Sequence, residues 1–341
     1  MDIQSAIKAV TAGKSLSITE ASNVFTSIME GAATDAQIAA FIVGLRMKGE
    51  SADEITGAAG VMRDKAARIV CDSHHNLIDT CGTGGDGSNS FNISTAAAFV
   101  AAGAGARVAK HGNRSVSSRS GSADVLEALG VNINLNAAQI SGCLNSLGIG
   151  FLFAPALHSA MRHAAPARKQ IGIRTVFNIL GPLTNPARTA NQLLGVFSPN
   201  LTETMAQVLR NMGSKRAFVV HGFDPIDEIS VCAATQISEI KEGGITTYKI
   251  EPEDFGLKKA KPQEIAGGDS AFNASIIIDI LNNKKGAARD VVVLNAAFAL
   301  CAADIVQSPQ DGIAAAQNSI ESGAALGKLQ ALIEFTSKFG S

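Results

Sequence analysis

The stretch LIDTCGTGGDGSNSFNIST, which runs from Leu77 to Thr95, decides the fold. It joins a mostly apolar segment, Leu77–Thr80, to a glycine-rich turn and then to a helix that we expect from about Asn92. A strand, a turn and a helix in that order form the repeating unit of sheets whose strands are mostly parallel. The stretch therefore predicts an α/β fold with helices covering the faces of a central sheet.

Short apolar segments continue to alternate with helical ones after this stretch. We expect further strands and helices, in chain order, at Arg107–Ala109, Ser122–Leu129 (helix), Leu193–Phe197, Glu203–Met212 (helix) and Ala217–His221. The segments on either side of Gly243-Gly244 predict an antiparallel hairpin, Ile237–Lys241 with Ile245–Ile250. The chain is helical again from Phe272 onward.

The chain before this α/β pattern is helical. Three helix starts carry capping boxes, in which a Ser or Thr is followed three residues later by Glu or Gln: Ser17 with Glu20, Thr34 with Gln37, and Ser51 with Glu54. Gly31 and Gly49 stand where helices should end. We predict a small α-helical domain at 1–72 and a large α/β domain at 73–341, with helices near 155–182 as candidates to join the first. Such a small bundle buries little by itself, so we expect it to pack on another domain or a second subunit.

Composition excludes several classes of protein. Among the 341 residues, 46% are apolar and 17% charged, which is enough to bury a core. Lys plus Arg (29) nearly balance Asp plus Glu (30), which disfavours a protein that binds nucleic acid through its phosphates. No apolar run approaches the roughly 20 residues of a membrane span. The five cysteines are scattered without metal-type spacing and the N-terminus does not resemble a signal peptide, so we expect reduced thiols and a cytoplasmic location.

The segment Gly82–Thr95 has the composition of a phosphate-binding loop. Its glycines permit close approach of the backbone to a ligand, and its hydroxyl and amide side chains stand where the helix should begin. It matches neither the P-loop pattern nor the dinucleotide-binding pattern. A flexible turn with an ordinary helix cap is the alternative interpretation.

A second polar segment, KHGNRSVSS at Lys110–Ser118, also follows a predicted strand. Because the carboxyl ends of parallel strands meet at one edge of a sheet, both segments should line the same ligand site. Lys110 offers a charge, Asn113 an amide and three serines their hydroxyls, while Ser122 could cap the next helix. A solvated basic turn is the alternative.

Two further segments could complete such a site. Asp227 and Glu228, in HGFDPIDE at 221–228, could hold magnesium beside phosphates, although adjacent acids are more often a solvated pair. Arg168 and Arg174 are the charges of interest in 166–187; Arg168 could bind a substrate carboxylate, or an arginine here could simply hold a loop against a helix.

Taken together, these segments resemble the anthranilate phosphoribosyltransferase family. The resemblance rests on GTGGD, NIST, KHGNR, GSADVLEALG, the Asp-Glu pair and RTVFNILGPLTNPA in this order, and it extends from the N-terminal helices beyond residue 300. It implies a fold of the nucleoside-phosphorylase type and a homodimer formed through the small domain. It also implies transfer of ribose 5-phosphate from PRPP to the amine of anthranilate, with two Mg²⁺ ions per monomer.

The resemblance further implies a role for each matching residue. The metal ligands would be Ser94, Asp227 and Glu228, and anthranilate would contact Gly82, Asn113 and Arg168. The residues that would bind PRPP are Gly82, Gly85, Asp86, Ser90, Asn92, Ile93, Ser94, Thr95, Lys110, His111, Gly112, Asn113, Arg114, Ser115, Val116, Ser117, Ser118 and Ser122.

Two positions depart from the family pattern, and two other functions remain as alternatives. Ser90 stands where threonine is usual and keeps the hydroxyl, whereas Pro225 replaces a common glycine and leaves the geometry of the acidic loop open. A pyrimidine nucleoside phosphorylase would share the fold but would not call for a paired-carboxylate metal site. A nucleic-acid-binding relative without catalysis would show degraded motifs and a basic face.

Overall fold

A seven-stranded sheet forms the centre of the large lobe in the computed structural model, which describes residues 1–115 and 119–340. The strand order is β3-β2-β1-β4-β5-β6-β7, in which β1 to β5 are parallel and the last two strands are antiparallel. The strands are β1 (Leu77–Gly82), β2 (Arg107–Gly112), β3 (Ile149–Phe153), β4 (Asn191–Gly195), β5 (Arg216–Gly222), β6 (Thr235–Lys241) and β7 (Gly244–Ile250).

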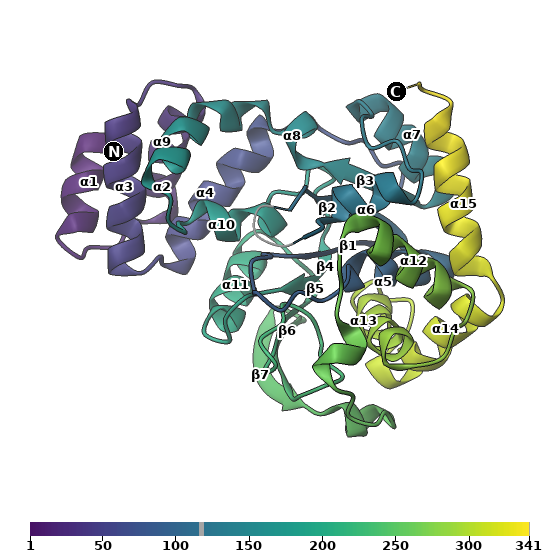
Figure 1. The fold of residues 1–341 in the computed structure, drawn as a ribbon. Helices are drawn as coiled ribbons and strands as arrows, with labels where there is room; N and C mark the ends of the chain where they lie inside the picture. The colour runs from purple at the N-terminus through teal and green to yellow at the C-terminus, as the bar shows by residue number, and fades with distance from the viewer. Residues whose placement is uncertain (116–118, 341) are drawn as a thin grey trace.

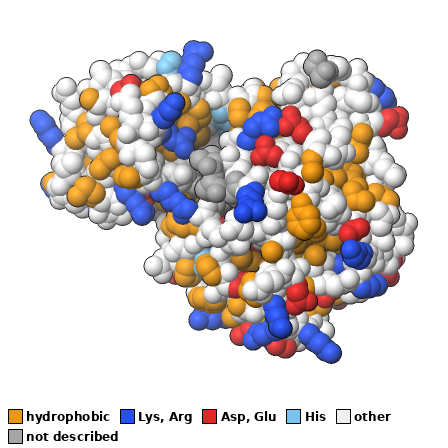
Figure 2. Space-filling view, in the orientation of Figure 1, with side chains coloured by type: hydrophobic (Ala, Val, Ile, Leu, Met, Phe, Trp, Pro, Cys, Tyr) orange, Lys and Arg blue, Asp and Glu red, His pale blue; other side chains and the backbone are white. Residues whose placement is uncertain are grey.

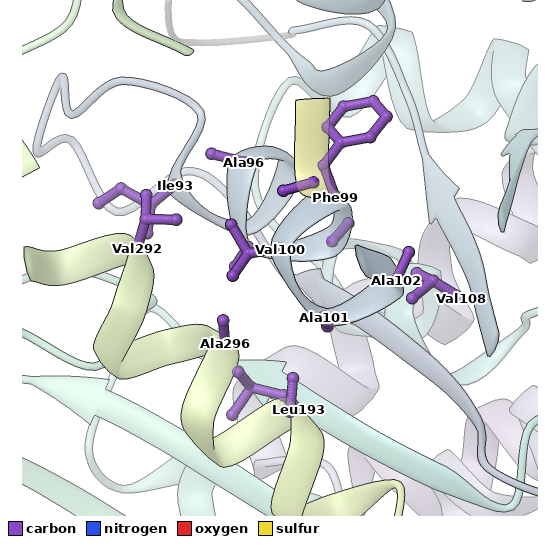
Figure 3. Close-up of a cluster of buried hydrophobic side chains, with 14 of the residues drawn as sticks. Ile93, Ala96, Phe99, Val100, Ala101, Ala102, Val108, Leu193, Val292 and Ala296 are labelled. Atoms are coloured by element: carbon purple, nitrogen blue, oxygen red, sulfur yellow. The ribbon is translucent and has the colours of Figure 1, made fainter. Parts of the chain in front are cut away.

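One face of this sheet is covered by helices rich in small apolar residues. Helix α5, which follows the glycine-rich loop, packs against α13, and Figure 3 shows Ile93 beside Val292 and Val100 near Ala296. Alanines along both helices allow this close packing. The large lobe contains the helices α5 (Ile93–Gly103), α6 (Ser122–Ala128), α7 (Ala137–Leu147), α12 (Ser270–Leu281), α13 (Ala287–Ala302), α14 (Pro309–Glu321) and α15 (Ala324–Ser337).

The N-terminal helices form a separate bundle at the left of Figure 1. All three predicted capping boxes are present, and Gly31 and Gly49 follow their helices with positive φ. The bundle packs on the large lobe because Phe25 and Phe41 share one buried cluster with Leu194 of β4. The helices of the bundle are α1 (Ile3–Thr11), α2 (Ile18–Met29), α3 (Asp35–Lys48) and α4 (Ala52–Lys65). Helices α9 (Ala165–Ile171) and α10 (Phe177–Leu180) pack on the bundle, α8 (Ala154–Leu157) contacts β3, and α11 (Leu201–Asn211) packs between α4 and the strands β5 and β6.

The strand expected at Leu193–Phe197 is present as β4, which begins two residues earlier and ends at Gly195, because residues 191–195 pair with 78–82 of β1. Two other points of local structure differ from the expectation. The strand β3 was not expected at all. Ser122 does not cap its helix: Gly121 is the cap residue, and the Ser122 hydroxyl donates to the Asn113 carbonyl at 3.3 Å.

The polar loops follow the carboxyl ends of the parallel strands, and this end of the sheet lies near the junction of the two lobes. Figure 2 shows Lys and Arg side chains on both lobes around this junction. Within the described part of the chain, no helix is long and apolar enough to cross a membrane.

Candidate active site

The first loop connects β1 to α5 and requires glycine at defined positions. Gly84 and Gly85 have φ of 65° and 71°, a left-handed conformation that other residues rarely adopt. At Gly82 a Cβ atom would lie 2.3 Å from a carboxylate oxygen of Asp227. The glycines therefore allow the acidic segment to approach the loop closely.

Hydrogen bonds join this loop to the acidic pair. The Gly84 N–H donates to the Asp227 carboxylate at 2.7 Å, and the Asp227 N–H donates to the Asp86 carboxylate at 3.1 Å. The Ser94 N–H, in the first turn of α5, donates to Glu228 at 3.2 Å. Two predicted segments, the first loop and the segment with the acidic pair, thus lie in direct contact.

The two carboxylates of the pair are half-buried and lie beside further negative charge. Burial raises the pKa of Asp227, and the charge of Asp86 raises it further. Burial also raises the pKa of Glu228, as does the charge of Asp227, whereas the opposite charge of Lys110 lowers it. Both carboxyl groups are therefore poorly compensated within the protein, and a cation would stabilise their ionised form.

Lys110, at the end of β2, lies in the interior next to this pair. Its side chain is buried, and its ammonium donates to the Thr80 carbonyl and, at 3.3 Å, to the Ser94 hydroxyl. Lys110 thus joins the ends of β1 and β2 to the start of α5. In this arrangement its charge faces the base of the first loop, and its contact with a phosphate stays a prediction.

The second loop connects β2 to α6, and contacts with α6 hold Arg114 and Ser115. Arg114 forms ion pairs with Asp124 at 3.0 Å and with Glu127 at 2.5 Å, and the Ser115 N–H donates to Asp124 at 3.1 Å. These contacts hold Arg114 against the helix. Of the predicted PRPP ligands in this loop, Val116, Ser117 and Ser118 lie outside the described residues.

A buried histidine pair lies behind the second loop. The Nε2 atoms of His111 and His158 are 3.2 Å apart, and Nδ1 of His111 is 3.1 Å from the Gly181 carbonyl oxygen. Burial, followed by the neighbouring His158, lowers the pKa of His111 to about 3, and burial lowers the pKa of His158 to about 4. Both rings are therefore neutral at pH 7.

The two predicted arginines have different positions. Arg168 stacks over Phe177 at 5.0 Å, and among the described residues no hydrogen bond or ion pair joins its side chain to either loop. Burial lowers its pKa. Arg174 instead donates to the Gly85 carbonyl and stacks over Phe197 at 4.7 Å, so it contacts the first loop directly.

Sequence reasoning missed several polar residues that support the site. Asp79 is fully buried in β1 and accepts hydrogen bonds from the His111 N–H and the Asn185 amide. His158 and Asn273 were also missed. An acidic residue inside the apolar segment Leu77–Thr80 was a signal for Asp79, whereas nothing in the local sequence indicated the other two.

Comparisons with known proteins agree with this architecture. A family model described as "Glycosyl transferase family, a/b domain" matches residues 74–326, and one described as "Glycosyl transferase family, helical bundle domain" matches residues 4–66. Anthranilate phosphoribosyltransferase from Acetivibrio thermocellus is 54% identical over 99% of this chain and 97% of its own. The enzyme of that name from Thioalkalivibrio sulfidiphilus is 53% identical over 98% of this chain and 99% of its own.

Solved structures give the same result. Anthranilate phosphoribosyltransferase from Thermus thermophilus superimposes with a TM-score of 0.92 at 40% identity, covering 97% of this chain and 99% of that one. The Saccharomyces cerevisiae enzyme, solved in complex with PRPP and Mg, superimposes with a TM-score of 0.89 at 30% identity over 98% of both chains. The same yeast enzyme has been solved with 4-fluoroanthranilate.

Proposed function

The chain belongs to the anthranilate phosphoribosyltransferase family, and from that premise we propose how its residues hold the two substrates. The reaction transfers the 5-phosphoribosyl group of PRPP to the amine of anthranilate, giving N-(5-phosphoribosyl)anthranilate and pyrophosphate. The first loop, the second loop and Ser122 would bind PRPP. Gly82, Asn113 and Arg168 would contact anthranilate.

The observation that carries this proposal is the meeting of the first loop with Asp227 and Glu228. The Ser94 N–H bond to Glu228 brings the start of α5 to the pair, so the carboxylates and the Ser94 hydroxyl, which now accepts from Lys110, would offer magnesium the oxygen ligands it prefers. Among the described residues, no group of three or more His, Cys, Asp or Glu side chains could hold a metal by itself. A protein that supplies one or two carboxylates and leaves the remaining ligands to phosphate and water fits this finding. We propose two Mg²⁺ ions per monomer, shared with the pyrophosphate group of PRPP.

The residues of the chain would act mainly by positioning. Magnesium, when bound, would stabilise the charge that develops on the departing pyrophosphate. Backbone N–H groups of the first loop and the N-terminus of α5 would be oriented before the reaction toward the same charge. His111 and His158 are weak bases, since their pKa values are lowered to about 3 and about 4, so neither would serve as a strong general base.

Substrate fluorescence provides a direct test of the function. Anthranilate fluorescence should fall when protein, PRPP and Mg²⁺ are mixed with it, and omission of either PRPP or Mg²⁺ should abolish the change. Uridine with phosphate serves as the control for the alternative. Phosphorolysis of uridine without consumption of anthranilate would identify a pyrimidine nucleoside phosphorylase instead.

Organisation and location complete the proposal. A division at 1–72 and 73–341 is supported by the separate bundle, although α9 and α10 share the buried cluster of the first part. We propose a homodimer formed through the helical bundle and a cytoplasmic location. Sedimentation of the purified protein tests the dimer, because a single species of monomer mass at micromolar concentration would contradict it.

A further inference from the structure

A contact from the C-terminal part of the chain reaches into the first loop. Asn273, in the first turn of α12, is 2% exposed. Its side-chain amide donates to Oδ1 of Asn92 at 3.0 Å, although the two residues are 181 positions apart. Asn92 immediately precedes α5, but its side chain does not cap that helix. The Asn92 side chain therefore makes its hydrogen bonds to residues outside α5.

The segment before α12 also pairs with the loop through backbone atoms. The Phe91 N–H donates to the Ile265 carbonyl at 3.3 Å, and the Gly267 N–H donates to the Asn89 carbonyl at 2.7 Å. At Gly267 a Cβ atom would lie 2.7 Å from the nitrogen of Phe91. The second half of the first loop thus lies directly against residues 265–268.

Four groups form a chain of hydrogen bonds with a fixed direction. The Gly268 N–H donates to Oδ1 of Asn273 at 2.7 Å, and Asn273 donates to Asn92. Nδ2 of Asn92 then donates to the Ser120 carbonyl at 3.2 Å. A backbone N–H can only donate and a carbonyl can only accept, so both amides are fixed in one orientation. Rotation of the Asn92 amide by 180° would oppose two donors at Asn273 and two acceptors at Ser120.

We propose that Asn273 is a positioning residue for PRPP, acting through Asn92. It fixes which edge of the Asn92 amide remains for a ligand, and through the bond to Ser120 it ties the first loop to the second. This inference rests on the proposed role of Asn92 in binding PRPP. It adds a residue from outside both loops to the machinery that orders them.

A double-mutant cycle tests this inference. Asn273→Ala should raise the KM for PRPP about tenfold, because Asn92 would lose one of the two hydrogen bonds that fix its orientation, and should leave the KM for anthranilate nearly unchanged. In an Asn92→Ala background the same substitution should have little further effect. Asn282→Ala, at the exposed end of the same helix, is the matched control and should leave both KM values unchanged.

The outcomes separate this inference from the proposed function. If Asn92→Ala and Asn273→Ala each raise the KM for PRPP and their effects multiply in the double variant, Asn273 acts independently of Asn92 and the inference is overturned. If Asn92→Ala leaves the KM for PRPP unchanged, the proposed role of Asn92 fails first. Asn273→Asp, which keeps the acceptor for the Gly268 N–H, replaces Asn273→Ala in the cycle if circular dichroism shows that the alanine variant is unfolded.

Discussion

Asp79 in β1 and the pair Asp227 and Glu228 both lie near the charge of Lys110, and they differ in how their own charge is compensated. Asp79 accepts hydrogen bonds from the His111 N–H at 3.1 Å, the Asn185 amide at 2.7 Å and the Cys81 thiol at 3.2 Å. Burial raises its pKa, while the charge of Lys110 and these bonds oppose the rise. Burial also raises the pKa of Asp227, and there the charge of Asp86 raises the pKa further.

The comparison distinguishes Asp79, which has donors within the protein, from the pair that we propose to bind magnesium. Asp79 is surrounded by donors from the protein itself, and its hydrogen bonds join β1 to β2 and to residue 185, although burial raises its pKa. Asp227 and Glu228 each accept a backbone hydrogen bond, but they lie next to each other and to Asp86, so their combined negative charge exceeds what Lys110 balances. A cation would stabilise the ionised form of this pair.

The sharpest test removes the charge of the acidic pair while keeping its shape. Asp227→Asn with Glu228→Gln should lower kcat/KM by roughly 1000-fold, because the metal would lose its carboxylate ligands. Steady-state kinetics at saturating Mg²⁺ checks this prediction. Retention of turnover within tenfold of the wild type would mean that the pair is not the metal site.

The matching change at the structural acid should affect stability. Asp79→Ala would leave the His111 N–H, the Asn185 amide and the charge of Lys110 without their buried partner. We expect the free energy of unfolding to fall by about 3 kcal/mol. Urea denaturation followed by circular dichroism measures the loss, and an unchanged midpoint would show that Asp79 does not stabilise the fold.

Much of this comparison could not be predicted from the sequence. The two loops, the acidic pair and Lys110 were predicted because each follows a strand, and parallel strands bring such positions to one edge. The position of Asp79 inside an apolar segment was a local signal, but its partner could not be predicted because Asn185 is 106 positions away and the contact exists only after the chain has folded. The same holds for Asn273, whose role depends on packing α12 against the first loop. Local sequence carries turn and cap signals but not these long-range hydrogen bonds.

A smaller effect on PRPP binding is expected from Arg174, which contacts the first loop. Arg174→Ala would remove the donor to the Gly85 carbonyl and the stacking on Phe197. We expect the KM for PRPP to rise about fivefold, with the unfolding free energy changed by less than about 1 kcal/mol. Arg162→Ala, an exposed arginine, is the control. A loss of stability without a change in KM would assign Arg174 a purely structural role.

The smallest expected effect is a dependence of magnesium stabilisation on pH. Because the pKa values of Asp227 and Glu228 are raised in the folded state, their ionisation destabilises the metal-free protein as pH increases. Magnesium binds the ionised form, so the rise in Tm on adding Mg²⁺ should be larger at pH 8 than at pH 6, by on the order of 2 °C. Thermal unfolding at both pH values measures it, and a larger rise at pH 6 would contradict the assignment.

The most direct measurement of the central claim is calorimetric titration of PRPP into the protein with and without Mg²⁺. The account predicts that Mg²⁺ strengthens PRPP binding to the wild type and to Asp79→Asn, provided that this variant folds. It predicts little strengthening in Asp227→Asn with Glu228→Gln, because the uncompensated pair would no longer hold the metal. Equal strengthening by Mg²⁺ in the wild type and in the Asp227→Asn, Glu228→Gln variant would contradict it.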